Sequence, residues 1–162
     1  MQDRADGSPL HERVAAYLRA HHTMTIATVS PVGNTPHAAS VFYSVGDDLR
    51  LVFLSKTGSV HGSHIGESAP IAVTVTEDYG DWEMIQGVQI WGDAYLLKGE
   101  ARVAALARYV LRFPFVRDLA KKPGLAETLR AIGVYAVVPV RAAFTDNTTG
   151  VFGREILELE VD

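Results

Sequence analysis

The sequence predicts a mainly antiparallel α+β fold, in which a barrel or curved sheet has helices packed at its side. Two observations lead to this prediction. Runs in which apolar and polar residues alternate, as in half-buried strands, recur along the chain. Most turns between consecutive runs are only a few residues long, which suits hairpins and is too short for the crossover that parallel strands require.

The N-terminal part is predicted to form one helix and a three-stranded meander. Ser8 suits the N-cap of the helix and Pro9 its first position. The apolar stripe of this helix consists of Leu10, Val14, Tyr17 and Leu18. Turn clusters at residues 31–36 and 46–48 separate three strands. These strands are expected at residues 24–29, 38–45 and 49–54.

The middle of the chain is predicted to form a loop with a short helix, followed by two further strands. The loop and helix occupy residues 55–66, and the strands are expected at residues 71–76 and 88–97. Gly92 interrupts the second of these strands, which indicates a bulge or a close approach of another backbone.

The C-terminal part is predicted to form two helices and two strands. A helix is expected at residues 100–113, ended by Pro114, and a shorter one after Lys122-Pro123. The residues expected on the buried side of the first helix are Val103, Leu106, Ala107, Val110 and Leu111. The strands are expected at residues 134–143 and 153–161, and Pro139 places part of the former at an edge or a bulge.

Length and composition limit the possible functions. The 162 residues suit one domain, expected at residues 9–162 after a disordered tail at residues 1–8. The chain has no Cys, which excludes disulfides and thiolate metal sites. A net charge of −4 and a basic cluster no longer than Lys121-Lys122 argue against nucleic-acid partners. Without an apolar run of membrane length or a secretory signal, we expect a cytoplasmic protein.

The stretch from Ser55 to Ile65 carries the clearest chemical signal. It combines hydroxyls, one lysine and two imidazoles, while its glycines allow close backbone approach and the start of a helix adds N–H donors. Such a set suits a phosphate monoester, although a polar surface loop has the same composition. His61 and His64 have a spacing that also allows a metal pair, but no third ligand has a clear spacing, so we assign no metal. A serine hydrolase is disfavoured because there is no Gly-x-Ser-x-Gly elbow.

The meander, this loop and the strand segment 86–92 together resemble the pyridoxamine 5′-phosphate oxidase-like split barrels, which bind flavin mononucleotide (FMN). The C-terminal part is more similar to an uncharacterised bacterial subgroup, the YhbP-like proteins. The resemblance covers about residues 10–160. The stretches that carry this similarity are Gly87-Val88-Gln89, Arg112-Phe113-Pro114-Phe115-Val116-Arg117 and Phe144-Thr145-Asp146-Asn147-Thr148-Thr149-Gly150.

The resemblance implies a split β-barrel and a homodimer with FMN at the subunit interface. It assigns the FMN phosphate to Ser55, Lys56, Thr57, Ser59 and His61. It places the flavin ring against Ala39, Ser40, Val41, Phe53 and Leu54, with Gln89 and Trp91 approaching from the long strand. The implied function is a flavin-dependent oxidoreductase acting on a small molecule.

Two departures from the family pattern qualify this expectation. The loop has only one lysine, where the family has several basic residues, and the acidic tail at residues 155–162 replaces a basic substrate signature. An acidic tail repels a phosphorylated substrate, so authentic pyridoxamine phosphate oxidation is not expected. Haem or a deazaflavin in place of FMN, a non-enzymatic flavin- or haem-binding or sensing module, and a structural protein with an empty barrel stay open as alternatives.

Overall fold

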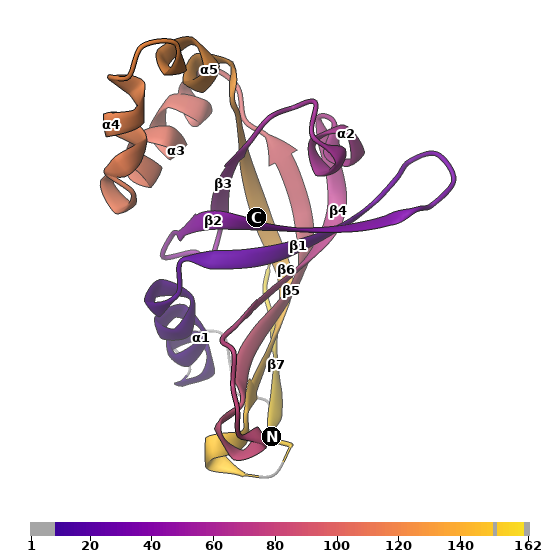
Figure 1. Ribbon diagram of the computed structural model, residues 1–162. Coiled ribbons are helices and arrows are strands. Elements are labelled where there is room, and N and C mark those ends of the chain that lie inside the picture. The colour runs from indigo at the N-terminus through magenta and orange to yellow at the C-terminus, as the bar shows by residue number, and fades with distance from the viewer. Residues whose placement is uncertain (1–8, 151, 161–162) are drawn as a thin grey trace.

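The chain forms an antiparallel barrel with helices on its outside (Figure 1). The computed structural model describes residues 9–150 and 152–160; the tail predicted at residues 1–8 lies outside them. Within the described part, the strands are β1 (Thr23–Val29), β2 (Pro36–Val45), β3 (Leu51–Ser55), β4 (Ser68–Thr76), β5 (Gln86–Leu96), β6 (Gly133–Asp146) and β7 (Arg154–Glu158). The α-helices are α1 (Pro9–Ala20), α2 (Val60–Ile65), α3 (Gly99–Arg112), α4 (Phe115–Ala120) and α5 (Leu125–Ala131).

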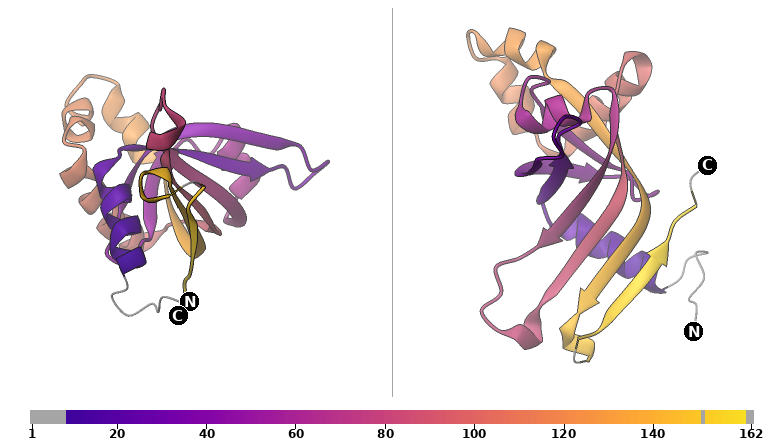
Figure 2. Two further views of the ribbon diagram at one scale, coloured as in Figure 1. Left: turned by 90° about the horizontal axis from the view of Figure 1, so that it is seen from below. Right: turned by 90° about the vertical axis from the view of Figure 1, so that its right-hand side faces the viewer.

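Six strands close the barrel and the seventh extends its edge. Their order is β3-β2-β1-β4-β5-β6-β7, and an additional pairing of β3 with β6 closes the ring. Every pairing is antiparallel, and β1, β2 and β3 form the predicted meander. The lower ends of β5 and β6 project beyond the barrel together with β7 (Figure 2). The prediction of an antiparallel barrel is therefore confirmed.

A bulge bends the long strand β5 where Gly92 predicted it. The register between β5 and β6 shifts between Trp91 and Gly92, and Gly92 is paired with Pro139. A Cβ atom on Gly92 would overlap the carbonyl oxygen of Val138. The two backbones can therefore approach only because residue 92 has no side chain. Pro139 has no N–H group to donate to the sheet, and it lies at this irregularity, where the missing hydrogen bond disturbs the ladder least.

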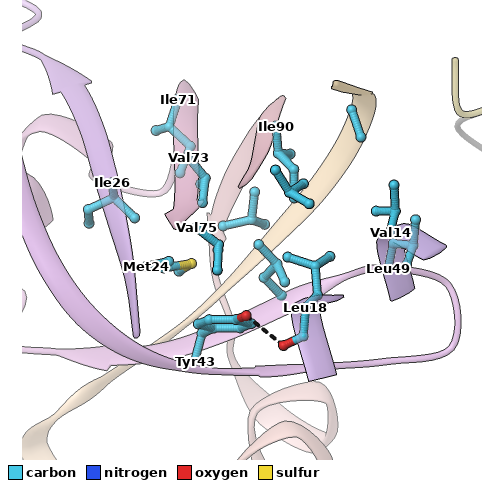
Figure 3. Close-up of a cluster of buried hydrophobic side chains, with 14 of the residues drawn as sticks. Val14, Leu18, Met24, Ile26, Tyr43, Leu49, Ile71, Val73, Val75 and Ile90 are labelled. Atoms are coloured by element: carbon cyan, nitrogen blue, oxygen red, sulfur yellow. Dashed lines mark hydrogen bonds between the residues drawn. The ribbon is translucent and has the colours of Figure 1, made fainter. Parts of the chain in front are cut away.

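The main core fills the barrel and the space beneath α1. The predicted stripe of α1 is buried, with Val14 and Leu18 fully enclosed. Figure 3 shows Leu18 beside Tyr43 of β2 and Val14 beside Leu49, in the same cluster as Met24 and Ile26 of β1. The Tyr43 hydroxyl donates to the carbonyl oxygen of Leu18 at 2.6 Å. This hydrogen bond satisfies one of the carbonyls that the last turn of a helix leaves unpaired.

Helices α3, α4 and α5 form a second layer over the outer side of β3 (Figure 1). Tyr109, Phe113 and Val116 make the small core of this layer, against the side chains of Val52 and Leu54. The prediction of which side of α3 is buried is wrong in part. Val103 and Leu111 are 65% and 82% exposed and Ala107 is exposed as well. The bulkier aromatic rings of Tyr109 and Phe113 occupy the contact with β3 instead. Helix α4, which follows Pro114, was not predicted.

Candidate functional site

The loop between β3 and α2 closes tightly onto the first turn of the helix. Ser59 is the N-cap of α2; its hydroxyl accepts a hydrogen bond from the amide of Gly62 at 3.1 Å and donates to the carbonyl of Lys56 at 2.8 Å. A Cβ atom on Gly62 would lie 2.6 Å from the Lys56 carbonyl oxygen and 2.7 Å from that of Thr57. The loop therefore has this shape because residue 62 is a glycine. We call residues 55–61 the cradle.

Three histidines gather beside the cradle, and we call His37, His61 and His64 the histidine cluster. The ring of His37, from β2, stacks on that of His61 with centroids 5.9 Å apart and meets that of His64 edge-on at 6.0 Å. His61 Nε2 lies 2.5 Å from the hydroxyl of Ser55. His64 Nδ1 lies 3.0 Å from the hydroxyl of Thr28, a residue buried on β1. Both α2 histidines are thus fixed by hydroxyls from neighbouring strands.

The surroundings of His61 favour its neutral form. Burial lowers the pKa of His61, and the charges that His37 and His64 carry when protonated lower it further. A neutral imidazole has one nitrogen that donates and one that accepts. His61 can therefore accept the hydroxyl proton of Ser55 at Nε2 and present an N–H group at Nδ1.

An unpaired tyrosine hydroxyl lies near the base of the cradle. Tyr135, on β6, is fully buried, and its hydroxyl has no hydrogen-bond partner among the described residues. Its ring stacks on Phe53 at 5.0 Å, and the Phe53 ring lies 6.5 Å from that of His61. The hydroxyl-bearing end of the ring lies against Gly133, which is paired with Ser55. Burial raises the pKa of this hydroxyl, so it stays protonated.

An apolar groove of about 740 Å³ runs along the outer face of the barrel, beside α2. Residues that line it include Ala27, Val29, His64, Ala72 and Trp91. A smaller hollow of about 200 Å³ continues along the same strands to Thr25 and Gln89. Pockets of this size accommodate cofactors and small ligands. His64 belongs to both the histidine cluster and the groove, so the two features adjoin.

Gln89 and Trp91 are held by an arginine from β7. The guanidinium of Arg154 donates to Gln89 Oε1 at 2.8 Å and lies over the Trp91 ring, 5.9 Å from its centroid. Trp91 stays 38% exposed. Both predicted residues of the long strand therefore lie on the outer face of the sheet.

The structure groups the residues predicted for the phosphate more closely than those predicted for the ring. Ser55, Ser59 and His61 lie together, since the hydroxyls of Ser55 and Ser59 are 3.2 Å apart. Lys56 and Thr57 are exposed beside them and line a cleft of about 500 Å³ opposite α5.

The residues predicted for the ring lie on different sides of the sheet. Ser40 is exposed on the outer side, 3.4 Å from the hydroxyl of Thr25. Ala39 and Val41 pack against the barrel core, where Phe53 is fully buried. Leu54 packs under the helical layer. The side chains of these five residues therefore do not form one continuous wall.

Sequence reasoning missed three residues that complete the site. His37 and Thr28 face each other across β2 and β1, and Tyr135 comes from the distant strand β6. The alternation of β2 places His37 on the same side as Ala39, which was the one available signal. The described residues include no group of three or more His, Cys, Asp or Glu arranged to hold a metal ion. None of their helices is long and apolar enough to cross a membrane.

The Phe144–Gly150 stretch has a structural role at the far end of β6. The Asp146 carboxylate accepts hydrogen bonds from the amide and hydroxyl of Thr148, and Arg13 of α1 lies 3.7 Å away. Asn147 donates to the carbonyl of Trp82 at 2.7 Å. These contacts join α1 to the ends of β5 and β6, at a distance from the cradle.

Comparison with known proteins assigns the chain to a family. A family model described as pyridoxamine 5′-phosphate oxidase matches residues 10–133. A UPF0306 protein of Klebsiella pneumoniae (strain 342) is 33% identical over 119 residues, which is 73% of each chain.

Two similar solved structures are named for haem. A haem-binding protein from Mycobacterium smegmatis has a TM-score of 0.68 and 16% identity, over 88% of this chain and 56% of that one. HutZ, the haem storage protein of Vibrio cholerae, has a TM-score of 0.62 and 13% identity, over 79% and 88%. At these identities the likeness concerns the fold, which is the split barrel that the resemblance implied. The chain belongs to the pyridoxamine 5′-phosphate oxidase family and, within it, to the UPF0306 (YhbP-like) group.

Proposed function

We propose that this protein binds FMN and uses it in oxidation–reduction of a small molecule. The observation that carries the proposal is the cradle itself, where Ser55, Ser59 and His61 meet beside the exposed Lys56. Membership of a family named for a phosphorylated substrate supports the same assignment.

The donor set of the cradle fits a phosphate monoester. Lys56 supplies a cation, Ser55 supplies a hydroxyl donor, and His61 supplies an N–H group, while Ser59 donates to the Lys56 carbonyl and shapes the loop. These groups would hold the phosphate, while the apolar groove beside α2 offers a wall for the ring. When bound, FMN supplies hydride and single-electron chemistry, which needs no catalytic acid or base from the protein.

The residues of this chain would orient the cofactor and exclude water from it. The N-cap of Ser59 and the tight contact at Gly62 hold the cradle in one shape before a ligand arrives. Such preorganisation limits the entropy that binding costs. The side chains of Ala27, Ala72 and Trp91 offer an apolar surface on which a planar ring displaces water.

We infer that a second copy of the chain covers this groove. Val29 is 53% exposed and Trp91 is 38% exposed on a face whose lining is mostly apolar. An apolar face of this kind favours association. The resemblance implies the same homodimer, with the cofactor at its interface. Light scattering at micromolar concentration tests this proposal, and a monomer would contradict it.

The acidic tail is less repulsive than its sequence suggests. Glu155 pairs with Arg13 at 2.7 Å and Glu158 with Arg141 at 2.8 Å, so two of its carboxylates have a cationic partner. The tail is therefore weak evidence about the substrate. The sparse basic residues of the cradle are the stronger reason to expect a substrate other than pyridoxamine phosphate.

Haem is a second candidate cofactor, favoured by the histidine cluster. Imidazole is a common axial ligand of haem iron, and two structural neighbours are named for haem. His64 lines the groove and is the histidine in position to meet a planar ligand there. With haem, the protein would be a binding or storage module.

Absorbance and titration distinguish these candidates. Purified protein is scanned for flavin or haem absorbance and then titrated with FMN and with riboflavin, which lacks the phosphate. The double variant Lys56→Ala/His61→Ala should weaken FMN binding by roughly 10²- to 10⁴-fold, since each charged hydrogen bond contributes roughly 1.5–3 kcal/mol. Riboflavin binding should change little.

A matched control removes a cation elsewhere. Lys121→Ala removes an exposed lysine that pairs with Asp118 and should leave both affinities unchanged. Equal loss of FMN and riboflavin in the double variant would show that the cradle does not hold the phosphate. Protein that binds haem and no flavin would overturn the FMN proposal in favour of haem.

A further inference from the structure

We propose that the histidine cluster couples FMN binding to the uptake of one proton at His61, so that the site releases FMN as the pH rises. This inference rests on the proposed function, because it concerns the same cradle. It assigns a regulatory role to His37 and His64, which have no assigned part in holding the phosphate.

The hydrogen-bond geometry of His61 requires a proton when an anion binds. Its Nε2 is already engaged with the Ser55 hydroxyl at 2.5 Å, while its Nδ1 has no partner among the described residues. A phosphate dianion only accepts hydrogen bonds, so the Ser55 hydroxyl donates its proton to the phosphate. The Ser55 oxygen can then only accept a hydrogen bond from His61. Nε2 must consequently donate to Ser55 while Nδ1 donates to the anion. Only the doubly protonated ring can do both.

The surroundings keep this ring neutral until an anion arrives. His37 stacks on it at 5.9 Å and His64 follows one turn later on the same helix, so two further imidazoles oppose its charge. Burial and these two neighbours lower the pKa of His61. A dianion in the cradle has the opposite effect, because a nearby negative charge favours the protonated ring.

Other titratable groups near α2 do not replace His61 in this role. The titratable side chains of residues 55–65 are those of Lys56, which precedes the helix, and of the two histidines. Strands β1 and β4, which pack against α2, carry none. Apart from His37, the titratable groups on the other packed strands are Tyr43 on β2 and Asp93 and Tyr95 on β5. None of these three is a cation near neutral pH.

The sign of the expected pH dependence follows from linkage. Where His61 is neutral in the free protein and protonated in the complex, binding consumes one proton, and the affinity falls tenfold for each unit of rising pH. The phosphate of FMN has a second pKa of about 6, so it is already a dianion above pH 7 and adds no opposing slope. Between pH 7.0 and 8.5, the pH dependence of the FMN affinity therefore reports the protonation of His61 and not that of the phosphate.

The test is the dissociation constant of FMN, measured by quenching of its fluorescence at pH 7.0, 7.5, 8.0 and 8.5. For the native chain we expect the affinity to fall with pH by up to about thirtyfold across this window. His61→Lys keeps a cation throughout the window, so its FMN affinity should stay level. His37→Gln/His64→Gln removes both neighbouring imidazoles and should move the fall to higher pH. Riboflavin should show no such fall in any of these proteins.

Each outcome has a distinct meaning. A fall for the native chain that disappears in His61→Lys supports the proposal, and circular dichroism confirms that the variants fold. FMN binding that is equally tight at pH 7.0 and 8.5 overturns the proton coupling and leaves the proposed function standing. Failure to bind FMN at every pH overturns both. A fall that persists unchanged in His61→Lys assigns the proton to another group and overturns the role of His61.

Discussion

Two buried tyrosines offer a matched test of the barrel interior. Tyr43 and Tyr135 are both fully buried. The Tyr43 hydroxyl donates to the carbonyl of Leu18 at 2.6 Å, whereas the Tyr135 hydroxyl has no partner within the described residues. Replacing each by phenylalanine removes one buried hydroxyl, which is hydrogen-bonded in Tyr43 and unpaired in Tyr135.

The expected changes in the free energy of unfolding have opposite signs. Tyr43→Phe removes a hydrogen bond and leaves the Leu18 carbonyl buried without its partner, which should cost about 1–3 kcal/mol. Tyr135→Phe removes a hydroxyl that is buried unsatisfied, so it should be neutral or stabilise the protein by about 1 kcal/mol. For a chain of this length, 1 kcal/mol corresponds to roughly 2–4 °C in Tm.

Urea denaturation followed by circular dichroism measures both free energies, and thermal denaturation checks their order. Tyr43→Phe should unfold at lower urea concentration than the native chain, and Tyr135→Phe at the same or a higher concentration. A loss for Tyr135→Phe as large as that for Tyr43→Phe would refute the reasoning. It would mean that the Tyr135 hydroxyl has a partner, such as a buried water molecule.

Two further predictions concern the far end of β6 and the helical layer. Burial raises the pKa of Asp146, but hydrogen bonds from Thr148 and Gln86 and the charge of Arg13 outweigh it and hold the pKa below its usual value. Asp146→Asn should therefore lower the stability at pH 7, and its deficit should shrink as the pH falls below about 4, measured by urea denaturation at each pH. Leu111→Lys should change the stability by less than about 0.5 kcal/mol, whereas Tyr109→Ala should cost about 3 kcal/mol. If thermal denaturation showed equal losses of stability in Leu111→Lys and Tyr109→Ala, it would contradict the observation that Leu111 is exposed and Tyr109 is buried.

The fold was predictable where local pattern and tertiary contacts agree. The alternation in β1 and the short turns fixed the meander, and Gly92 marked the bulge because its cause is local steric crowding. The face of α3 was not predictable, since apolar residues surround most of this helix. Its orientation depends on which side chains fit the outer side of β3, and that is a tertiary property.

The cradle was also predictable, because its chemistry is concentrated in one short segment. The predicted loop and short helix are present, and Ser59 and Gly62 explain their geometry. The histidine cluster was not predictable, because His37 reaches it only through the register of β2 with β1. Tyr135 comes near the base of the cradle through the closure of the barrel by β3 and β6, which no local pattern encodes.

The alternation of strand side chains divides the candidate site into two parts. Ser55 shares the side of β3 on which Phe53 enters the core, and His37 shares the side of β2 that faces α2. Gln89 and Trp91 lie on the outer face. A ligand that touches both parts must therefore pass around α2 rather than lie flat on one surface. His64 is where these parts meet, since it contacts His37 on one side and lines the groove on the other. A helix of six residues is too short to be stable alone. Hydrogen bonds to hydroxyls of both β1 and β3 therefore hold α2 in the position that joins the two parts.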